Sequence, residues 1–379
     1  MTSIKIKKTI FAFLNQEKVL NDHTMVMKKI LLLLALFMGV FCSCARDDEL
    51  PDIDTAKYTG DSWEGLNSPW VKDADTYDHT TLWSCIYYGS YPTNEVVDRP
   101  FTAVDDYALA AGDVILDATL FSRLEQAEWT NEETTLDGTR YRRINGSGAV
   151  SWATNRAQHY RWADASNYHY FAYAPIRWRI LNITGNKALL LADRMPDSHP
   201  FHSTDVDINW SDCDLRRWLN AEFFDRAFTE SERQAVLETE VKNAPNYYFG
   251  TTCGPDTRDH VFILSEAEVF SSSLAMDYGF YPGDGTDDPA RRFRSTLYAK
   301  CRGAWWSPVE GYQGNSFWMM RSSGYTGVNV TYVCDFGYLY NRGTVVTCDD
   351  AALLPAITID LSKAHYTVAP SVSSTEVKR

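Results

Sequence analysis

Histidines and carboxylates lie close together at Asp197-Ser-His-Pro-Phe-His202, with Asp205 and Asp207 following. Imidazole and carboxylate groups can bind divalent metal ions. Their spacing matches no standard helix-borne motif such as H-E-x-x-H. The run Gly283-Asp-Gly-Thr-Asp-Asp288 could offer oxygen ligands to calcium, but it lacks the spacing and the terminal glutamate of an EF-hand loop. We therefore expect no metal and no other cofactor.

A second group of residues with chemical potential is the aromatic and polar cluster in the last third of the chain. Rigid aromatic rings give a large contact area at low entropic cost, and Asn, Asp and Arg add directional hydrogen bonds. Such a set suits a sugar or a protein ligand. The candidates for an exposed binding surface are Tyr325, Asn329, Asp335, Tyr338, Tyr340 and Asn341.

Six cysteines follow Cys44, at positions 85, 213, 253, 301, 334 and 348. An even number in an oxidising compartment permits disulfides in many connectivities. No C-x-x-C spacing supports a zinc ribbon. Cys334 and Cys348 flank an expected hairpin and are the disulfide candidate, whereas Cys213 is expected to be a buried free thiol.

No catalytic residue is predicted. The chain contains no G-x-S-x-G, no H-E-x-x-H and no Gly-rich phosphate loop. Carboxylate pairs are abundant, but an acidic chain always offers them, and a sequence does not give their separation. The absence of these motifs favours a non-enzymatic protein. The alternatives are an extracytoplasmic enzyme and a structural component of a surface assembly.

The N-terminal region carries a pattern typical of a secretory signal. Met27-Lys-Lys precedes an apolar run from Ile30 to Phe41, and the small residue Ser43 stands directly before Cys44. A membrane-spanning helix needs about 20 apolar residues, so this run is short for that role. Cleavage before Cys44 would free a thiol for acylation, with Cys42 as the competing site. We expect a lipid-anchored protein of the outer membrane or cell surface, translated from Met25 or Met27.

The chain is acidic, with a formal net charge of −14. Without residues 1–43, whose six lysines outnumber Glu17 and Asp22, the net charge is −18. Such a surface repels phosphate backbones, and no basic stripe offsets it, so nucleic acid is not an expected partner. The expected partners are the membrane, through the lipid, and a glycan or protein ligand.

Periodicity predicts an α+β body. Residues 175–181 alternate apolar and basic side chains, Gly185-Asn186 turns the chain, and residues 187–192 form a second strand. Helical spacing follows at 215–224, and Thr229-Glu-Ser-Glu232 is a capping box. Short strands dominate both ends, which indicates α+β rather than a doubly wound sheet. The expected organisation is a signal peptide at 1–43, a lipidated acidic linker at 44–80, one domain at 81–362 and a flexible tail at 363–379.

The order of several phrases resembles an uncharacterised bacterial family known only as a domain of unknown function. Each phrase alone is weak, whereas the ordered series from about residue 83 to 361 is specific. The matching phrases are Tyr88-Gly-Ser-Tyr-Pro92, Ile176-Arg-Trp-Arg-Ile-Leu181, Lys187-Ala-Leu-Leu-Leu191, Cys213-Asp-Leu-Arg-Arg-Trp-Leu-Asn220, Val261-Phe-Ile-Leu-Ser265, Phe317-Trp-Met-Met-Arg-Ser-Ser-Gly324 and Leu354-Pro-Ala356. Departures from the family phrases fall in the last third, where Ser323 replaces a proline and no arginine precedes Pro355.

The family is similar to the C-type-lectin-like architecture, in which short strands and two to three helices support long loops. This resemblance implies a surface recognition role, with Trp318 and Arg321 as scaffold. It also admits a cysteine-pair oxidase that uses Cys334 and Cys348, although the usual Arg-Gly-Gly-Ser-Trp phrase is missing. The acidic run after Cys44 resembles the export tag of surface lipoproteins in the Bacteroidetes.

Overall fold

The computed structural model describes residues 56–58, 61–74, 79–100, 109–145, 164, 166–270, 273–283 and 287–375. The chain divides into two units, residues 1–54 and 55–379, and all the described residues lie in the second. The expected signal peptide and Cys44 therefore lie outside the described residues. None of the helices in the described part is long and apolar enough to cross a membrane.

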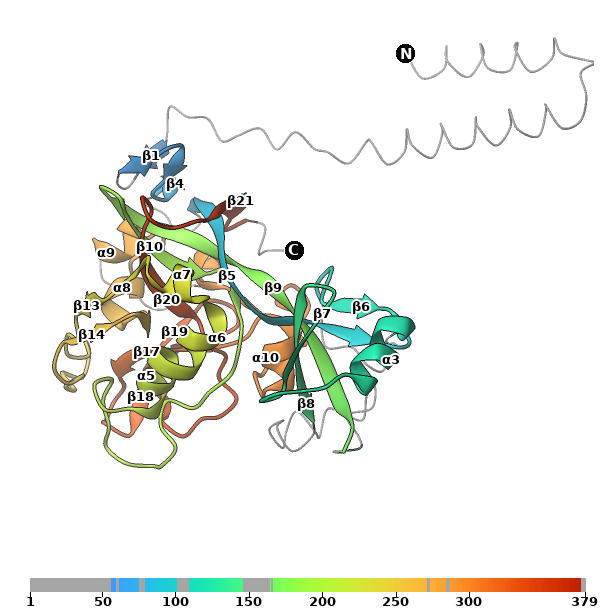
Figure 1. Ribbon diagram of the computed structural model, residues 1–379. Helices are drawn as coiled ribbons and strands as arrows, with labels where there is room; N and C mark the ends of the chain where they lie inside the picture. Colours follow the sequence, from blue (N-terminus) through green and yellow to red (C-terminus); the bar gives the residue numbers. More distant parts are fainter. Residues whose placement is uncertain are drawn as a thin grey trace, which may run out of the picture. The chain divides into compact units, whose positions relative to one another are not determined.

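The dominant element of the described residues is a twisted sheet of 12 strands (Figure 1). Its main path runs in the order β1-β4-β5-β9-β10-β20-β12, and five further strands pair along it. The path strands are β1 (Ala56–Tyr58), β4 (Trp70–Lys72), β5 (Thr80–Val97), β9 (Tyr168–Thr184), β10 (Lys187–Ala192), β20 (Pro355–Asp360) and β12 (Val236–Leu237). The branching strands are β6 (Val114–Leu116), β7 (Glu133–Leu136), β8 (Thr139–Asn145), β15 (Val261–Ile263) and β21 (Thr367–Ser373).

Strands β5 and β9 are long, with 18 and 17 residues, and they pair antiparallel. Figure 1 shows them running from the main body to a smaller lobe that contains β6, β7, β8 and the helix α3 (Ala118–Gln126). Their register shifts between Tyr87 and Ser90, where Gly89 has a φ of +66°. A left-handed residue within a strand produces a bulge that increases its twist. The bulge lets one strand pair serve both lobes.

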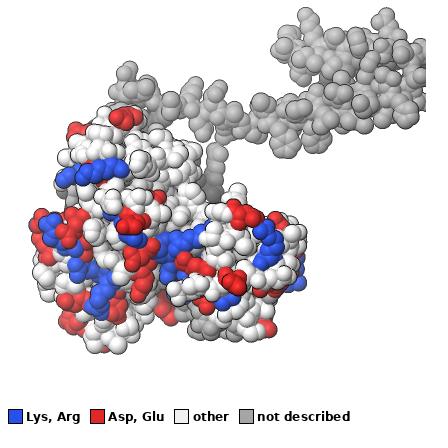
Figure 2. All heavy atoms as spheres, viewed as in Figure 1, with Lys and Arg blue, Asp and Glu red and all other residues white. Residues whose placement is uncertain are grey.

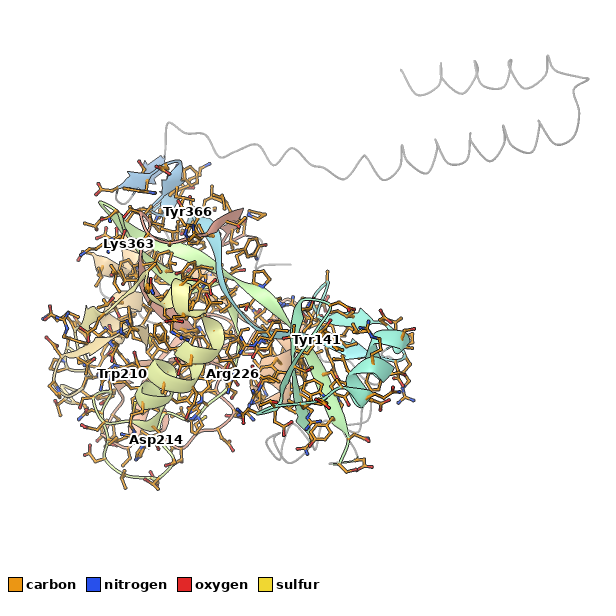
Figure 3. All side chains as sticks on the ribbon, in the orientation of Figure 1. Tyr141, Trp210, Asp214, Arg226, Lys363 and Tyr366 are labelled. Atoms are coloured by element: carbon orange, nitrogen blue, oxygen red, sulfur yellow. The ribbon has the colours of Figure 1, made fainter. Side chains whose placement is uncertain are left out.

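Helices are short and cover part of the sheet. Leu215, Leu219 and Phe223 are fully buried at a spacing of four residues, as the predicted helical face requires. This stretch consists of α5 (Asp214–Trp218), the π-helical η3 (Leu219–Phe223) and α6 (Phe224–Ala227). Asp214 at its start and the buried Trp210 are labelled in Figure 3. The remaining helices are α7 (Glu230–Arg233), α8 (Glu266–Phe270), α9 (Leu274–Asp277), the 3-10 helix η4 (Pro289–Arg291) and α10 (Leu297–Cys301).

Smaller sheets complete the described body. A three-stranded sheet contains β17 (Trp318–Ser323), β18 (Asn329–Val333) and β19 (Leu339–Val345). The two-stranded pairs are β2 (Ser62–Trp63) with β3 (Leu66–Asn67), β11 (Arg194–Met195) with β16 (Arg294–Ser295), and β13 (Thr239–Val241) with β14 (Thr257–Asp259). The parallel β11–β16 pair holds Arg194 beside Arg294.

Two hydrophobic cores stabilise the body. The large core lies between the sheet and the helices and includes Trp83, Trp178 and Trp318. The small core of the second lobe includes Val96, Phe121, Leu124, Tyr141 and Tyr170, and Tyr141 is labelled in Figure 3. Val96 and Tyr170 belong to β5 and β9, so the long strand pair contributes to both cores.

The fold is mostly β, which corrects the expected α+β, C-type-lectin-like class. The predicted 175–181 and 187–192 hairpin and the Thr229–Glu232 capping box are confirmed. The predicted strand begins at Pro175, and no strand is predicted through Gly89 and Pro92. In the structure all three lie inside long strands. Gly89 and Pro92 are at register shifts of β5, and Pro175 on β9 pairs with Ser90, beside the first shift.

The expected linker and tail are also corrected. Part of the region assigned to the linker at 44–80 forms β2, β3 and β4, and β4 pairs with the start of β5. Part of the region assigned to the tail at 363–379 forms β21, which pairs with β5 over Leu82 to Tyr87. Each segment supplies backbone hydrogen bonds that the β5 edge requires.

The buried side chains of β21 allow a test of its role in stability. Val372 is 3% exposed, whereas Val368 on the same strand is 63% exposed. Changing Val372→Ala removes buried methyl groups and should lower the free energy of unfolding by about 2 kcal/mol. The matched change Val368→Ala should lower it by less than about 0.5 kcal/mol. Urea denaturation measures both values, and equal effects would contradict the docking of β21.

Candidate functional site

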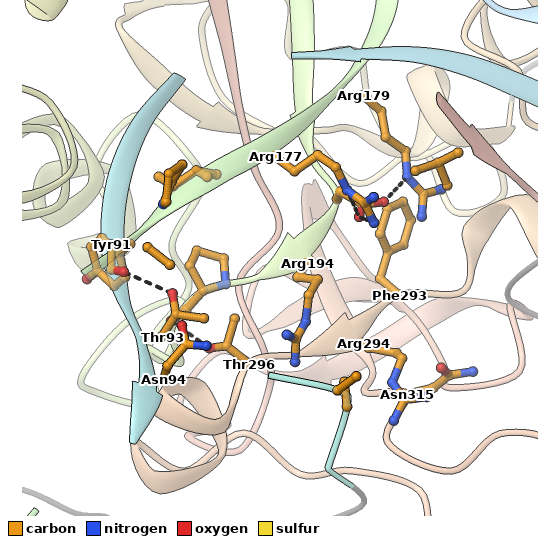
Figure 4. Close-up of a pocket in the computed structure, with 18 of the residues that line it drawn as sticks. Tyr91, Thr93, Asn94, Arg177, Arg179, Arg194, Phe293, Arg294, Thr296 and Asn315 are labelled. Atoms are coloured by element: carbon orange, nitrogen blue, oxygen red, sulfur yellow. Dashed lines mark hydrogen bonds and ion pairs between the residues drawn. The ribbon is translucent and has the colours of Figure 1, made fainter. Parts of the chain in front are cut away.

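A pocket of about 830 Å³ lies where β5 and β9 face the β11–β16 pair. Of the described residues that line it, five are arginines, and Asp193 is the one acidic residue. The arginines are Arg177, Arg179, Arg194, Arg292 and Arg294. Figure 4 shows Thr93, Asn94 and Thr296 on the other side of the pocket. The lining therefore carries a strong excess of positive charge in an acidic protein.

Asp193 holds two of the arginines in place. Arg177 and Arg179 are two residues apart on β9, so their side chains leave the same face of the strand. The Nε atoms of both donate to Asp193 carboxylate oxygens at 2.7 Å. Burial would raise the pKa of Asp193, but the charges of Arg179 and Arg177 outweigh burial and lower it. Asp193 therefore stays ionised and fixes both guanidinium groups.

Arg179 is further fixed by aromatic rings. Its guanidinium carbon lies 4.3 Å from the Phe293 ring centroid and 4.8 Å from the Trp83 ring centroid. Arg179 is 2% exposed, and its Nη1 is buried without a hydrogen-bond partner among the described residues. A buried guanidinium N–H without a partner costs free energy.

Arg194 and Arg294 extend the positive lining. Arg194 donates from Nη1 to Asp113 Oδ1 at 2.7 Å and from Nη2 to the Ser295 carbonyl oxygen at 3.0 Å. Burial lowers the pKa of Arg294, and the like charge of Arg194 lowers it further. Next to them, burial lowers the pKa of Lys300 to about 7, and Arg194 and Arg294 add to the shift, although Asp113 opposes it. The local potential is thus positive enough to disfavour further cations.

Neutral polar groups occupy the opposite wall. Thr93 Oγ1 donates to the Tyr91 carbonyl oxygen at 2.9 Å, and Asn94 donates from Nδ2 to the Gly112 carbonyl oxygen. Tyr91 is oriented by Asp197 Oδ2, which accepts its hydroxyl proton at 2.6 Å, and by Arg226 Nη1 at 3.0 Å. The pocket therefore combines fixed cationic groups with hydroxyl and amide groups. This combination suits a ligand that carries an anionic group and hydroxyls.

One of the six predicted binding residues, Asp335, contacts a lining residue of this pocket, and Tyr338 and Tyr340 follow it in sequence. Asp335 is in the turn between β18 and β19, and its carbonyl oxygen accepts from Nδ2 of the pocket residue Asn315 at 3.0 Å. Tyr338 follows in the same turn, and its ring packs 5.0 Å from that of Tyr340. Tyr340 is 39% exposed.

Two of the other three residues, Tyr325 and Asn341, contact a separate loop at 246–249. Tyr325 is 53% exposed and packs edge-on against Phe249, with the ring centroids 5.1 Å apart. The Asn341 carbonyl oxygen accepts from Asn246 Nδ2 at 3.3 Å. Asn329 begins β18, and its Oδ1 accepts from Thr326 at 2.7 Å. The expected single surface is thus divided into two areas. Trp318 and Arg321 are buried, as the scaffold assignment requires.

Cys334 and Cys348 are both free thiols in the structure, so the expected bridge is not formed. Cys334 adjoins the turn end of the hairpin, where Val333 pairs with Leu339. Cys348 lies beyond the opposite end, where Asn329 pairs with Val345. A disulfide needs Cα atoms within about 7 Å, which opposite ends of a hairpin do not allow. The prediction for Cys213 is confirmed, because it is a buried free thiol.

The histidine and carboxylate run at 197–202 is dispersed. Asp197 is buried against Tyr91, and His199 stacks on Trp218 at 5.0 Å. His202 faces Asp214, with Nδ1 and Oδ2 2.9 Å apart. Within the described ranges, no group of three His, Cys, Asp or Glu side chains is placed to hold a metal ion. These side chains serve packing and helix capping.

The sequence interpretation missed the pocket arginines. Arg177 and Arg179 are the basic half of the alternating pattern at 175–181, which predicts a half-buried strand but no site. Arg292 and Arg294 lie in a run, Arg291-Arg-Phe-Arg294, that received no interpretation. The alternation at 175–181 could have indicated the pocket, because two basic side chains on one face of a strand require either water or an acidic partner. The partner, Asp193, directly follows the next strand.

Comparison with known proteins gives one match. Residues 185–361 match the family model of a domain of unknown function, DUF6273. Neither the curated proteins nor the solved structures gave a match to this chain. The DUF6273 segment begins at the β9–β10 turn and ends just after β20. It includes Arg194, Arg292 and Arg294, whereas Arg177 and Arg179 lie before it.

A buried carboxyl supports the loop that packs against Tyr325. Glu266 is 3% exposed, and its Oε2 accepts from the Tyr247 N–H at 3.3 Å. Its Oε1 is buried without a hydrogen-bond partner among the described residues. Burial raises the pKa of Glu266 to about 7, although the Tyr247 N–H acts in the opposite direction. The folded protein therefore favours the protonated carboxyl.

This shift predicts a pH dependence of stability. Between pH 4.5, the ordinary pKa of this carboxyl, and pH 7 the folded state binds more protons than the unfolded state, so stability falls as pH rises. Glu266→Gln removes this titration. The free energy of unfolding of the variant, relative to that of the unchanged protein, should therefore be higher at pH 8 than at pH 5, by at most about 3 kcal/mol. Urea unfolding at both pH values measures the difference. The exposed control Glu310→Gln should give no such change, and an unchanged pH slope in Glu266→Gln would contradict the assignment.

Proposed function

We propose that this protein is a non-enzymatic binding module of the cell envelope that captures an anionic ligand in the arginine-lined pocket. The observation that carries the proposal is the convergence of Arg177, Arg179, Arg194, Arg292 and Arg294 on one pocket with a single acidic lining residue. Guanidinium groups present planar donor pairs that match carboxylate, sulfate and phosphate oxygens. Surface charges of both signs are mixed on the face drawn in Figure 2, so the pocket differs from that surface in its charge.

Pre-organisation supports binding as the role of the pocket. Asp193 and the rings of Phe293 and Trp83 hold Arg179 before any ligand arrives. Arg194 is likewise held by Asp113 and Ser295. Fixed donors lose little conformational entropy when they bind an anion. A positive site in an acidic protein also attracts small anions selectively, because extended polyanions meet the surrounding negative charge.

The alternatives have weaker support. A hydrolase would need an acid or base with a suitable pKa, yet the pKa of the lining carboxyl Asp193 is lowered by its arginines. A cysteine-pair oxidase would need a reactive thiolate. Burial raises the pKa of Cys334 to about 11 and that of Cys348 to about 12, which disfavours thiolates at neutral pH. A structural part of a surface assembly would not need a pocket of this charge.

Anion binding is tested directly with inorganic sulfate. The full chain, purified in detergent, should bind sulfate by isothermal titration calorimetry, with affinity that falls as sodium chloride rises. Arg294→Gln removes one charged donor and should weaken binding about ten- to thirty-fold. Arg217→Gln, at a side chain that is 60% exposed, is the matched control and should bind like the unchanged protein. Absence of sulfate and phosphate binding, or equal loss in both variants, would refute the proposal.

The envelope location is part of the proposal and rests on the signal pattern before Cys44. Expression with radiolabelled palmitate should label the unchanged protein. Cys44→Ala should abolish the label, because the thioether-forming thiol is absent. The neighbouring Cys42→Ala serves as the control and should leave labelling intact. Label that persists in Cys44→Ala but disappears in Cys42→Ala would place the anchor at the other cysteine, and no label in any form would remove it.

A further inference from the structure

A row of aromatic side chains begins at the rim of the pocket. Gly311 and Gln313 line the pocket, and Tyr312 lies between them in sequence. The guanidinium carbon of Arg292, also a lining residue, lies 5.0 Å from the Tyr312 ring centroid. Arg292 Nε donates to the Phe336 carbonyl oxygen at 2.8 Å. Arg292 therefore connects the pocket to the turn between β18 and β19.

From Tyr312 the rings continue across the three-stranded sheet. The aromatic row is defined here as Tyr312, Phe336, Tyr338, Tyr340 and Tyr332. Successive ring centroids are 6.2, 6.2, 5.0 and 4.8 Å apart. Tyr332 and Tyr340 are cross-strand partners and stack at an interplanar angle of 6°. Partly exposed rings at these spacings form a continuous surface rather than isolated side chains.

The charge around the row is opposite to that of the pocket. Burial raises the pKa of Tyr340, and Cys334, Tyr338 and the carboxylates of Asp335 and Asp287 raise it further. Asp287 is exposed and Asp335 is half-buried. A ligand that lay along the row with a negative charge on every unit would be repelled there. A ligand with one anionic end and an uncharged remainder fits both regions.

Sugar rings have the chemistry that the row requires. Their C–H faces pack on flat aromatic rings, and their hydroxyl groups hydrogen-bond to carboxylate side chains such as that of Asp335. The anionic end would enter the pocket, where guanidinium donors and the hydroxyls of Thr93 and Thr296 are available. Uncharged rings would then extend past Tyr312.

We propose that the ligand is an oligosaccharide with a single anionic group at one end, bound with that group in the arginine pocket and its neutral sugars on the aromatic row. This inference rests on the proposed anion-binding function. The anionic group could be a uronate, a sulfate or a phosphate ester, which share the same recognition by arginine. Which of these is preferred is an outcome of the test.

The test compares short and long ligands on the full chain by isothermal titration calorimetry. The short probes are glucuronic acid, glucose 6-sulfate and glucose 6-phosphate, and the long probes are glucose tetrasaccharides with the same group at one end. The preferred tetrasaccharide should bind about tenfold or more tightly than its monosaccharide, because the added rings stack on the row. An uncharged tetrasaccharide should bind more weakly than either.

Substitutions in the row separate stacking from charge. Tyr338→Ala with Tyr340→Ala should remove the gain from chain length and leave the affinity for the acidic monosaccharide unchanged. Tyr338→Phe with Tyr340→Phe keeps the rings and should restore the gain, which rules out a merely misfolded turn. Tyr247 lies outside the row and is 77% exposed. Tyr247→Ala is therefore the control, and it should keep the gain in affinity from chain length.

The outcomes distinguish the two proposals. If sulfate, phosphate and the acidic monosaccharides all fail to bind, the proposed function fails. If they bind but lengthening adds nothing, or the gain survives Tyr338→Ala with Tyr340→Ala, only the present inference is overturned. A single-stranded oligonucleotide or a sugar chain sulfated on every unit that binds more tightly than the end-charged tetrasaccharide would also overturn it.

Discussion

The ion pairs that Asp193 forms with Arg177 and Arg179 are the constraint on which the pocket depends. A buried carboxylate is tolerated only when cations compensate for its lost hydration. Here Asp193 follows β10 and the arginines belong to β9, so the interaction ties the end of one hairpin strand across its partner. The same contacts aim two guanidinium groups into a space that the β11–β16 pair closes from the other side. Stability of the sheet and charge of the pocket thus share one set of side chains.

Among the described lining residues, five arginines face a single acid, Asp193, so positive charge is in excess at the lining. Asp113 compensates Arg194 from behind, which still leaves more cations than anions. Burying such a surplus costs free energy, and the lowered pKa values of Arg294 and Lys300 reflect this cost. A site that is costly without a ligand gains most when an anion binds. The surplus therefore explains why the pocket is better suited to binding than to packing.

The sequence predicted local features better than the architecture. The hairpin at 175–192, the capping box at Thr229 and the buried helical face each depend on a few neighbouring residues, and these were correct. The mostly β class was missed because the decisive elements are long strands that contain Gly89 and Pro175. In addition, β4 has only three residues, and β21 pairs with a strand that is distant in sequence. Pairing with β5 supplies the hydrogen bonds of these strands, which no local pattern encodes. Of the predicted binding residues, Tyr338 and Tyr340 belong to the aromatic row, whereas Tyr325 packs against Phe249 instead.

The pocket is a joint product of two stretches of the chain. The DUF6273 segment supplies Arg194, Arg292 and Arg294, and the preceding strand β9 supplies Arg177 and Arg179. Strand β5, which also precedes the segment, contributes Tyr91, Thr93 and Asn94 to the opposite wall. A DUF6273 segment without an equivalent of β5 and β9 would carry three of the arginines but neither the Asp193-bound pair nor that wall. The affinity for an anion should therefore depend on the long strand pair as much as on the matched segment, and this makes β5 and β9 the elements to compare first between proteins that share the family match.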